Sequence, residues 1–354
     1  MKQLRVSLIG FGVVGQGLAE LLHTKHPMLQ QEFGLDITLV SVANARHGFI
    51  YRKEGLDIPT LLELAATGQP LTNHPNIQHW QKTIEGLQVT GKEGDVLAEV
   101  TGTNLRDAEP GISHIRAALS QGMHVITANK GPMALAAPEL FSLAQQHGVQ
   151  LRIESTVMAG TPVISTLCEG MAGTRVQSMR GILNGTTNYI LSAMATGRDY
   201  METLQEAQAQ GYAEADPTAD VEGYDAVAKT LILASVVFKQ QLRPDQVIRQ
   251  GIPTITRQQM QQAVEQGKRI KLIASLRLLP AHEAQNSTLL EAKVEPMELP
   301  LSDPLAHVDG VLNAITILTD TLAEVTIIGP GAGRLQTGQG LLTDLLTIAR
   351  SSAP

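Results

Sequence analysis

Short apolar runs alternate with amphipathic helical patterns through the first part of the chain. The runs predict buried strands, and they lie at residues 4–9, 37–42, 96–101, 124–128 and 151–155. Helical patterns stand between them, with Val14, Leu18, Leu21 and Leu22 on one face, and others near 112–120 and 138–147. Strands that alternate with helices predict an α/β fold, a Rossmann-type doubly wound parallel sheet.

The pattern changes after Thr156. Helices are predicted from Pro162 to about Met171 and at 187–196, 201–210 and 225–239. Strands are predicted at 176–183, 271–279, 289–294 and 325–328, before a closing helix that reaches about Ala349. We therefore expect a nucleotide-binding domain at 1–135, to which 320–354 returns, and an α+β domain at 136–319.

A glycine-rich turn follows the first predicted strand. Gly10 permits the turn, Gly12 lets the backbone approach a pyrophosphate, and Gly15 lets the helix pack close to the strand. The helix that begins at Val13 and Val14 offers unpaired amides to phosphates. The strand–turn–helix context favours a dinucleotide site over a turn that serves chain reversal alone.

The end of the second predicted strand bears on the choice of cofactor. An enzyme strict for NAD usually places an acid there to hold the ribose 2′-hydroxyl, and this chain has none. Arg46 is in position to meet a 2′-phosphate instead, although it is also consistent with a surface arginine that has no role. The sequence favours NADP and leaves NAD open.

Two further polar positions follow predicted strands. Thr101 and Lys130 each come at the carboxyl end of a strand, the edge where ligands bind in doubly wound sheets. We therefore expect both residues to face the cofactor.

A turn-rich acidic stretch at 211–229 leads into an apolar helix. Its five carboxylates are Glu214, Asp216, Asp220, Glu222 and Asp225. Asp225 and Lys229 stand four residues apart, hence on one helical face, which is also the spacing of an ordinary solvated salt bridge. The apolar neighbours of Lys229 predict that it is partly buried, and a buried lysine needs partners.

Composition narrows the classes of partner. Hydrophobic residues make up 43% of the 354-residue chain, and the net charge of -7 argues against nucleic acid. Cys168, the only cysteine, is expected to be a small core residue, and His23, His26 and His114 are expected at the surface. We find no secretion signal and no apolar run long enough for a membrane span, so we expect the cytoplasm.

Several motifs occur in the order found in one family. They are Gly-Phe-Gly-Val-Val-Gly at 10–15, Thr-Ala-Asn-Lys at 127–130, Glu-Ser-Thr-Val-Met-Ala-Gly-Thr-Pro at 154–162, Gly-Ile-Leu-Asn-Gly-Thr-Thr-Asn-Tyr-Ile-Leu at 181–191, the acidic stretch, and Gly-Pro-Gly-Ala-Gly at 329–333. On these motifs the chain resembles homoserine dehydrogenase, in a short form without a C-terminal regulatory domain. The resemblance implies reversible reduction of L-aspartate 4-semialdehyde to L-homoserine by NAD(P)H, in threonine and methionine biosynthesis.

The resemblance also implies roles for residues. Lys229 is the expected proton donor or acceptor, Lys130 lies between cofactor and substrate, and the amino acid is bound by Glu214, Asp225 and the same cluster's Asp220. We add Gly211 and Gly333 to the cofactor site. A monovalent cation, Na⁺ or K⁺, is expected at Glu154, Val157, Ala159 and Thr161, where Met158 replaces the family's usual glycine.

The implied chemistry suits these residues. Hydride that arrives at an aldehyde carbon leaves negative charge on oxygen, which a nearby ammonium stabilises and can protonate.

The predicted strands of the middle region are few and dispersed for a self-contained sheet, so we expect a homodimer built through that region, as the resemblance also implies.

Two rival interpretations stay open on the sequence. Another amino-acid dehydrogenase with the same fold would keep the glycine turn but not the series at 181–229. A regulator that senses NADP without turnover would have no use for Lys229 beside so many carboxylates.

Overall fold

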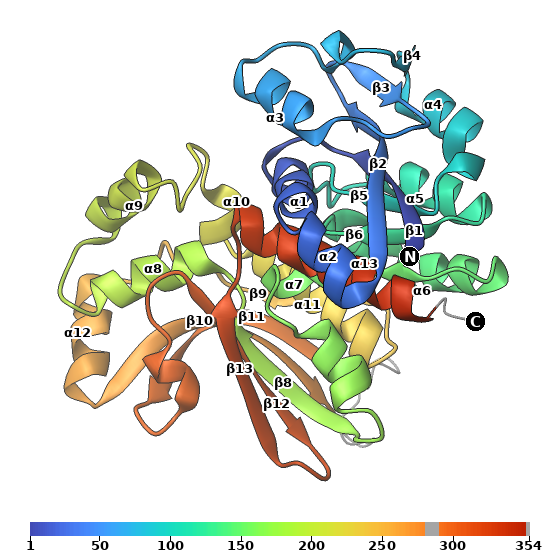
Figure 1. The fold of residues 1–354 in the computed structure, drawn as a ribbon. Coiled ribbons are helices and arrows are strands. Elements are labelled where there is room, and N and C mark those ends of the chain that lie inside the picture. Colours follow the sequence, from blue (N-terminus) through green and yellow to red (C-terminus); the bar gives the residue numbers. More distant parts are fainter. Residues whose placement is uncertain (280–289, 352–354) are drawn as a thin grey trace. The chain divides into compact units, whose positions relative to one another are not determined.

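Two sheets organise the chain, one in each of two units (Figure 1). The computed structural model describes residues 1–279 and 290–351. Unit 1 comprises Met1–Pro162 and the C-terminal residues from Ala332 on, and unit 2 comprises Val163–Gly331. These boundaries differ from the predicted ones near 135 and 320. The reason is that β7 (Leu151–Arg152) pairs with β6 (His124–Thr127), so the first sheet continues beyond residue 135.

Unit 1 is built around a seven-stranded sheet in the order β4-β3-β2-β1-β5-β6-β7. The predicted strands are β1 (Lys2–Ile9), β2 (Leu35–Asn44), β5 (Val96–Glu99), β6 and β7, and they pair in parallel. The sequence patterns missed β3 (Gly48–Tyr51) and β4 (Gln78–Trp80), which extend the sheet as antiparallel strands. The predicted Rossmann-type parallel sheet is confirmed.

The helices of unit 1 include the predicted α1 (Val13–Thr24) and α5 (Gly111–Ser120), and a four-residue helix, α7 (Ser155–Met158). The helix predicted at 138–147 is part of α6 (Lys130–Gln146), which begins earlier and is kinked at Ala136. The patterns missed α2 (His26–Phe33), α3 (Ile58–Ala66) and α4 (Thr83–Thr90). The closing helix α13 (Arg334–Ser351) packs on α1 at two glycines, since a Cβ on Gly17 would stand 2.2 Å from the Arg334 carbonyl oxygen. Gly338 meets the backbone of Gly17 and Leu18 in the same way. Leu341, Leu345 and Ile348 of α13 then join the core around β1.

Unit 2 contains a six-stranded sheet in the order β13-β12-β8-β10-β11-β9. The strands are β8 (Val176–Ile182), β9 (Ile248–Arg249), β10 (Lys268–Leu278), β11 (Leu290–Pro300), β12 (Leu312–Thr319) and β13 (Glu324–Pro330). Neighbours are antiparallel except β9 and β11. Leu289, predicted to begin a strand, lies outside the described residues. The expectation that these strands are too few for a self-contained sheet is wrong, because β12 and β9 complete it.

The helices of unit 2 carry three of the predicted site residues, Asp220 on α10 (Thr218–Val221) and Asp225 and Lys229 on α11 (Tyr224–Val237). The other helices are α8 (Gly185–Met194), α9 (Tyr200–Ala209) and α12 (Arg257–Glu265), with a π-helical turn at Thr166–Gly170 and 3₁₀ turns at Pro244–Gln246 and Pro304–His307. The α11 helix packs on the sheet, and its Thr230 and Leu233 line a small cleft with Met179, Leu276 and Ile315. Most of α11 is buried, which agrees with its near-continuous apolar sequence.

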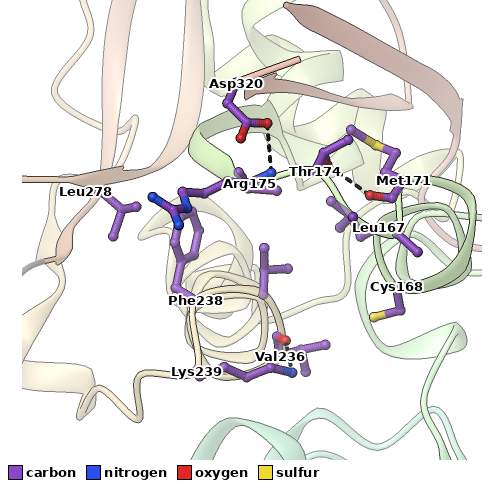
Figure 2. Close-up of a pocket in the computed structure, with 14 residues that line it drawn as sticks. Leu167, Cys168, Met171, Thr174, Arg175, Val236, Phe238, Lys239, Leu278 and Asp320 are labelled. Carbon is purple, nitrogen blue, oxygen red and sulfur yellow. Dashed lines mark hydrogen bonds between the residues drawn. The ribbon is translucent and has the colours of Figure 1, made fainter. Parts of the chain in front are cut away.

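Two side chains lie where the sequence did not predict them. His114 is buried rather than at the surface, because it sits on the inner side of α5 with Nδ1 3.5 Å from the buried Glu99 carboxylate. Cys168 is exposed rather than in the core. It lines a hollow of about 770 Å³ between the π-helical turn and the C-terminal end of α11, and Figure 2 shows it with Phe238 and Lys239. None of the predicted site residues lines this hollow.

No helix of the described ranges 1–279 and 290–351 has both the length and the apolar character needed to cross a membrane. The cytoplasmic location stays a prediction.

Candidate active site

The glycine turn after β1 has the conformation that its spacing predicts. Gly10 has φ +104°, and a Cβ there would stand 2.5 Å from the Val100 carbonyl oxygen. A Cβ on Gly15 would stand 2.0 Å from the Gly10 carbonyl oxygen. Gly12 is different, because a Cβ there would project into open space with no atom within 4 Å. Gly10 and Gly15 are thus required by the fold, and Gly12 keeps space clear in front of α1.

The N-terminus of α1 points amides at that space. Gly12 is its N-cap without a side-chain cap, and the first turn carries no acid. Val13 is 66% exposed, so the start of the helix is accessible. The chain crosses from β2 to β5 on opposite sides of β1, which makes this the switch point of the sheet, the usual place for a dinucleotide. These residues therefore fit a pyrophosphate group.

Thr101 and Asn129 are joined at the same edge of the sheet. Asn129 Nδ2 donates to Thr101 Oγ1 at 3.1 Å, and Asn129 Oδ1 caps α6 by accepting from the Gly131 amide. The Thr101 amide and hydroxyl both donate to Glu99, a fully buried carboxylate that the patterns did not single out. Lys130 directly follows Asn129 in the chain, is the first residue of α6 and is half-buried. The structure thus brings Thr101 and Lys130 to the edge where both were predicted.

The turn after β2 is organised by Asn44. Its Oδ1 accepts from the amides of Arg46, at 3.0 Å, and His47, at 2.7 Å. The Arg46 side chain is exposed. Asn44 thus occupies the end of the strand where an NAD-specific enzyme would hold an acid, and the turn presents Arg46 to solvent.

The two other glycines assigned to the cofactor site belong to different units. Gly333 precedes α13 in unit 1 with φ +130°, and a Cβ there would stand 2.2 Å from Gln336 Oε1. Gly211 follows α9 in unit 2 with φ +73° and is exposed. Both glycines therefore serve turns of the backbone, and their contact with a cofactor stays a prediction.

Lys229 lies deep in unit 2 and is fixed by two partners. Its Nζ stands 2.8 Å from Asp225 Oδ2 and donates to the Leu183 carbonyl oxygen at 2.5 Å. The Lys229 side chain is 7% exposed and that of Asp225 is 18% exposed. The pair is therefore no solvated surface salt bridge, and the predicted burial of Lys229 is confirmed.

Asn184 joins the acidic residues, and the sequence patterns gave it no role. Its Nδ2 donates to Asp220 Oδ1 at 2.7 Å and to Asp225 Oδ2 at 3.0 Å. Its Oδ1 caps α8 by accepting from the Thr187 amide at 2.9 Å. The only available signal was its place after a strand in the 181–191 motif, and an asparagine before a helix reads as a simple N-cap.

Burial and the charge of Asp225 both change the pKa of the Asp220 carboxyl. Burial raises the pKa of the Asp220 carboxyl, and the charge of Asp225 raises it further, while hydrogen bonds from Asn184 and Thr186 oppose the shift. A positive group placed between these carboxylates would relieve the repulsion. The arrangement is suited to bind a primary ammonium.

Glu214 differs from the rest of the cluster. Its side chain is exposed, and its carbonyl oxygen accepts from Gln208 Nε2 at 3.1 Å. Thr186, by contrast, contacts the acidic cluster directly. Its hydroxyl lies 3.2 Å from Asp220 Oδ2 and 2.7 Å from the Tyr212 carbonyl oxygen. The structure thus brings Asp220, Asp225 and Lys229 together around Asn184 and leaves Glu214 at the surface.

The predicted cation residues lie in one tight turn of unit 1. Glu154 is the N-cap of α7 rather than part of a strand, and its amide donates to Asp344 at 3.0 Å. Ala159 has φ +51°, a conformation unusual for a residue with a side chain, and its carbonyl oxygen lies against Gly340. Among the described residues no group of three or more His, Cys, Asp and Glu side chains could hold a metal ion.

Comparison with known proteins agrees with this geometry. The sequence pattern of the family described as "Homoserine dehydrogenase, NAD binding domain" matches residues 10–154, and that of "Homoserine dehydrogenase" matches residues 162–346. A relative from Pseudomonas canavaninivorans, named NAD(+)-dependent homoserine dehydrogenase, is 37% identical over 99% of this chain and 98% of its own.

The chain belongs to the homoserine dehydrogenase family.

Solved structures of this family share the fold. A homoserine dehydrogenase from Thiobacillus denitrificans superposes with a TM-score of 0.82 at 33% identity, covering 99% of this chain and 74% of that one. A hyperthermophilic archaeal homoserine dehydrogenase in complex with NADPH gives a TM-score of 0.82 at 29% identity, covering 100% and 99%.

The chain is thus a homoserine dehydrogenase, an NAD(P)-dependent oxidoreductase that acts on a CH–OH group. This result agrees with the resemblance drawn from the motifs. The rival interpretations, a different amino-acid dehydrogenase and a sensor without turnover, do not account for matches over both units.

Proposed function

We propose that this chain interconverts L-homoserine and L-aspartate 4-semialdehyde at the site formed by Lys229, Asp225, Asp220 and Asn184. The observation that carries the proposal is the burial of Lys229 with its Nζ held between a carboxylate and a carbonyl oxygen. A lysine so enclosed has its ammonium fixed in place, as a proton donor to a substrate oxygen must be.

The reaction removes two hydrogens from the alcohol. When bound, the oxidised cofactor would supply the acceptor for one of them, which leaves as hydride from the carbon that bears the hydroxyl. In this direction Lys229, as the neutral amine, takes the hydroxyl proton and becomes the ammonium, and in the other direction the ammonium gives that proton to the aldehyde oxygen. Asp225 keeps the lysine positioned and balances its charge, and the Leu183 carbonyl oxygen restricts its rotation.

The amino acid brings an ammonium and a carboxylate. Asp220 and Asp225, bridged by Asn184, supply a concentrated negative charge that suits the ammonium. Glu214, exposed on the loop before them, adds a further carboxylate at the surface of the site. In this proposal Asn184 keeps the two aspartates at a fixed separation.

The nucleotide is held by backbone in unit 1. Gly10, Gly12 and Gly15, with the amides of Val13 and Val14, would bind the pyrophosphate, and Thr101 would face the nicotinamide end. Gly211 and Gly333 belong to the same proposed set, and Lys130 would orient cofactor or substrate. Arg46 favours NADP through its charge near a 2′-phosphate. The archaeal homoserine dehydrogenase solved with NADPH and the relative named NAD(+)-dependent together keep both cofactors within the proposal.

A monovalent cation is part of the proposal. Carbonyl oxygens of the turn at Glu154, Val157, Ala159 and Thr161 would hold Na⁺ or K⁺, since hard cations prefer oxygen ligands. Exchanging Na⁺ or K⁺ for tetramethylammonium at constant ionic strength should lower activity or thermal stability. Equal activity and equal stability in both salts would refute the ion site.

The proposal includes a homodimer that works in threonine and methionine biosynthesis. Support comes from β13, an edge strand of the second sheet, where Ile328 is 52% exposed, and from Leu312 and Leu322, 40% and 48% exposed. Exposed apolar side chains at a sheet edge are well suited to pair with a second copy. Sedimentation at micromolar protein should show a species near twice the 37.9 kDa chain mass. A fully active monomer would refute the dimer.

The decisive experiment follows absorbance at 340 nm with L-homoserine and NADP, and separately with NAD. Turnover of homoserine supports the proposal. Inertness with homoserine and activity on another amino acid would replace it, and no turnover with any amino acid would favour a protein that only binds the cofactor.

A further inference from the structure

A short turn joins the two halves of the acidic site. It runs through Glu222, Gly223 and Tyr224 and connects α10, which carries Asp220, to α11, which carries Asp225 and Lys229. Gly223 makes the turn in the left-handed conformation, with φ +82°. The conformation of this turn therefore sets the separation of the two aspartates.

Arg249, on strand β9, contacts both ends of this turn. Its guanidinium donates to the Glu222 carbonyl oxygen and lies 3.3 Å from Glu222 Oε2. It also donates to Tyr224 Oη at 3.1 Å, and its Cζ stands 4.1 Å from the centre of the Tyr224 ring. One planar side chain thus contacts main chain, carboxylate, hydroxyl and ring, a set that the fork of an arginine matches and a lysine does not.

The backbone around Arg249 supports the same turn. The Ile252 amide donates to the Val221 carbonyl oxygen at 2.9 Å. A Cβ on Gly251 would stand 2.6 Å from that oxygen, so the segment after β9 lies directly against the end of α10. The turn is therefore packed on one side against a fixed strand, with Arg249 as its side-chain contact.

The fit of Asn184 shows how narrow the tolerance is. Its single Nδ2 reaches Asp220 at 2.7 Å and Asp225 at 3.0 Å. Both bonds need the aspartates to keep their separation, and a displacement near 1 Å would break one of them. Without Arg249 the turn would keep the Ile252–Val221 hydrogen bond at its α10 end but lose the side-chain contacts at Glu222 and Tyr224, which allows such a displacement.

We infer that Arg249 is a positioning residue for the amino-acid substrate, which acts by fixing the turn that spaces Asp220 and Asp225. The inference rests on the proposed function. The competing interpretation is an ordinary partly exposed ion pair, since the side chains of Arg249 and Glu222 are 27% and 41% exposed. Such pairs contribute little by themselves. The two interpretations differ in what they predict for catalysis.

The test compares Arg249→Ala with Arg243→Ala, a matched control. Arg243 is also an arginine of unit 2, but its side chain is 69% exposed and its guanidinium donates to Asp245 Oδ1 at 3.1 Å instead of to the turn. For Arg249→Ala we expect kcat/KM for homoserine to fall about tenfold or more, because small displacements of substrate-binding groups cost that much. The KM for NADP should stay unchanged, and Arg249→Lys should recover only part of the loss.

A value of kcat/KM for Arg249→Ala equal to that of Arg243→Ala would overturn the inference, as would an equal loss for NADP and homoserine. If Arg249→Ala does not fold, Tyr224→Phe decides. It removes the hydroxyl contact and keeps the ring, so it should raise the KM for homoserine at unchanged melting temperature, and an unchanged KM would refute the inference.

Lys229→Ala, assayed alongside, separates this inference from the proposed function. If Lys229→Ala keeps turnover, the proposed function fails. If Lys229→Ala is inactive and Arg249→Ala behaves as the control does, only the role of Arg249 fails.

Discussion

The nucleotide unit and the amino-acid unit build their sites from different material. In unit 1 the proposed pyrophosphate site is backbone, shaped by Gly10 and Gly15, which have no room for a Cβ, and by Gly12, which faces open space. In unit 2 the site is a cluster of side chains, in which Asn184 joins Asp220 and Asp225, and Asp225 holds Lys229.

The difference teaches how each site should respond to substitution. A backbone site tolerates or rejects a side chain by volume, because the amides that bind phosphate are present in every residue but proline. A side-chain site depends on the charge and the proton of named groups. Conservative changes should therefore be costly in unit 2, and small increases in volume should be costly in unit 1.

The largest effect is expected at Lys229. Lys229→Ala should lower kcat by about 10²–10⁴-fold, because a positioned proton donor contributes that much. Cofactor binding, measured by fluorescence or calorimetry, should stay nearly intact. Lys229→Arg should not restore activity, since a guanidinium hardly gives up a proton. More than a tenth of wild-type kcat in Lys229→Ala would exclude the catalytic role.

Two substitutions in the glycine turn should have different effects, one on stability and the other on cofactor binding. Gly15→Ala places a Cβ 2.0 Å from a carbonyl oxygen and should lower the free energy of unfolding by about 1–3 kcal/mol. Gly12→Ala meets no protein atom, so its melting temperature should stay near wild type while the KM for NADP rises, because the methyl group would occupy the space where the pyrophosphate approaches the backbone. Identical behaviour of the two variants would contradict the distinction between them.

The acidic cluster should govern the substrate and not the cofactor. Asp225→Asn and Glu214→Gln should each lower kcat/KM for homoserine, with the larger loss at Asp225, because it is the more buried and contacts Lys229. Asp225→Asn should also lower the free energy of unfolding, because it leaves the buried Lys229 ammonium without its charged partner. Unchanged kcat/KM in both variants would move the substrate site elsewhere.

Arg46 should affect the choice of nucleotide alone. Arg46→Ala should weaken NADP more than NAD, by about tenfold in the ratio of kcat/KM, since only NADP carries the 2′-phosphate. Steady-state kinetics with both cofactors measures this ratio. Equal losses with NADP and NAD would show that the arginine is a surface residue without this role.

The smallest effect concerns stability at Asp220. Because the pKa of this carboxyl is raised by burial and by the charge of Asp225, the unfolded chain ionises at lower pH than the folded one. This group therefore reduces stability as the pH rises from the ordinary carboxyl range of about 4 through its raised value. Asp220→Asn should lack that loss and melt about 1–3 °C higher at neutral pH, while binding homoserine less well. A difference in melting temperature that does not grow with pH would contradict the assignment.

Much of unit 1 was predictable because its signals are local. The glycine turn, the apolar strands and the amphipathic α1 each lie within a few residues of sequence, and the structure reproduces them. The missed elements carry weaker patterns. Strand β4 has three residues that are mostly exposed, and β12 was missed although its pairing with β8 and β13 completes the second sheet.

The sequence by itself determined the pairs that a single helix or turn imposes. Asp225 and Lys229 are four residues apart on α11, so their proximity follows from helical geometry wherever the helix lies. Gly15 is of the same kind, since the atom that leaves no room for its Cβ is the Gly10 carbonyl oxygen of the same turn, whereas Gly10 is confined by the distant Val100.

Only the tertiary structure decided which distant residues meet. Asn184 reaches Asp220 and Asp225 across 36 and 41 residues, and Arg249 reaches Glu222 across 27. The burial of His114 and the exposure of Cys168 depended on packing in the same way. The physical reason is that these contacts follow from how strands pair and helices pack on them, and that register is set by the combined burial of many side chains rather than by any short pattern.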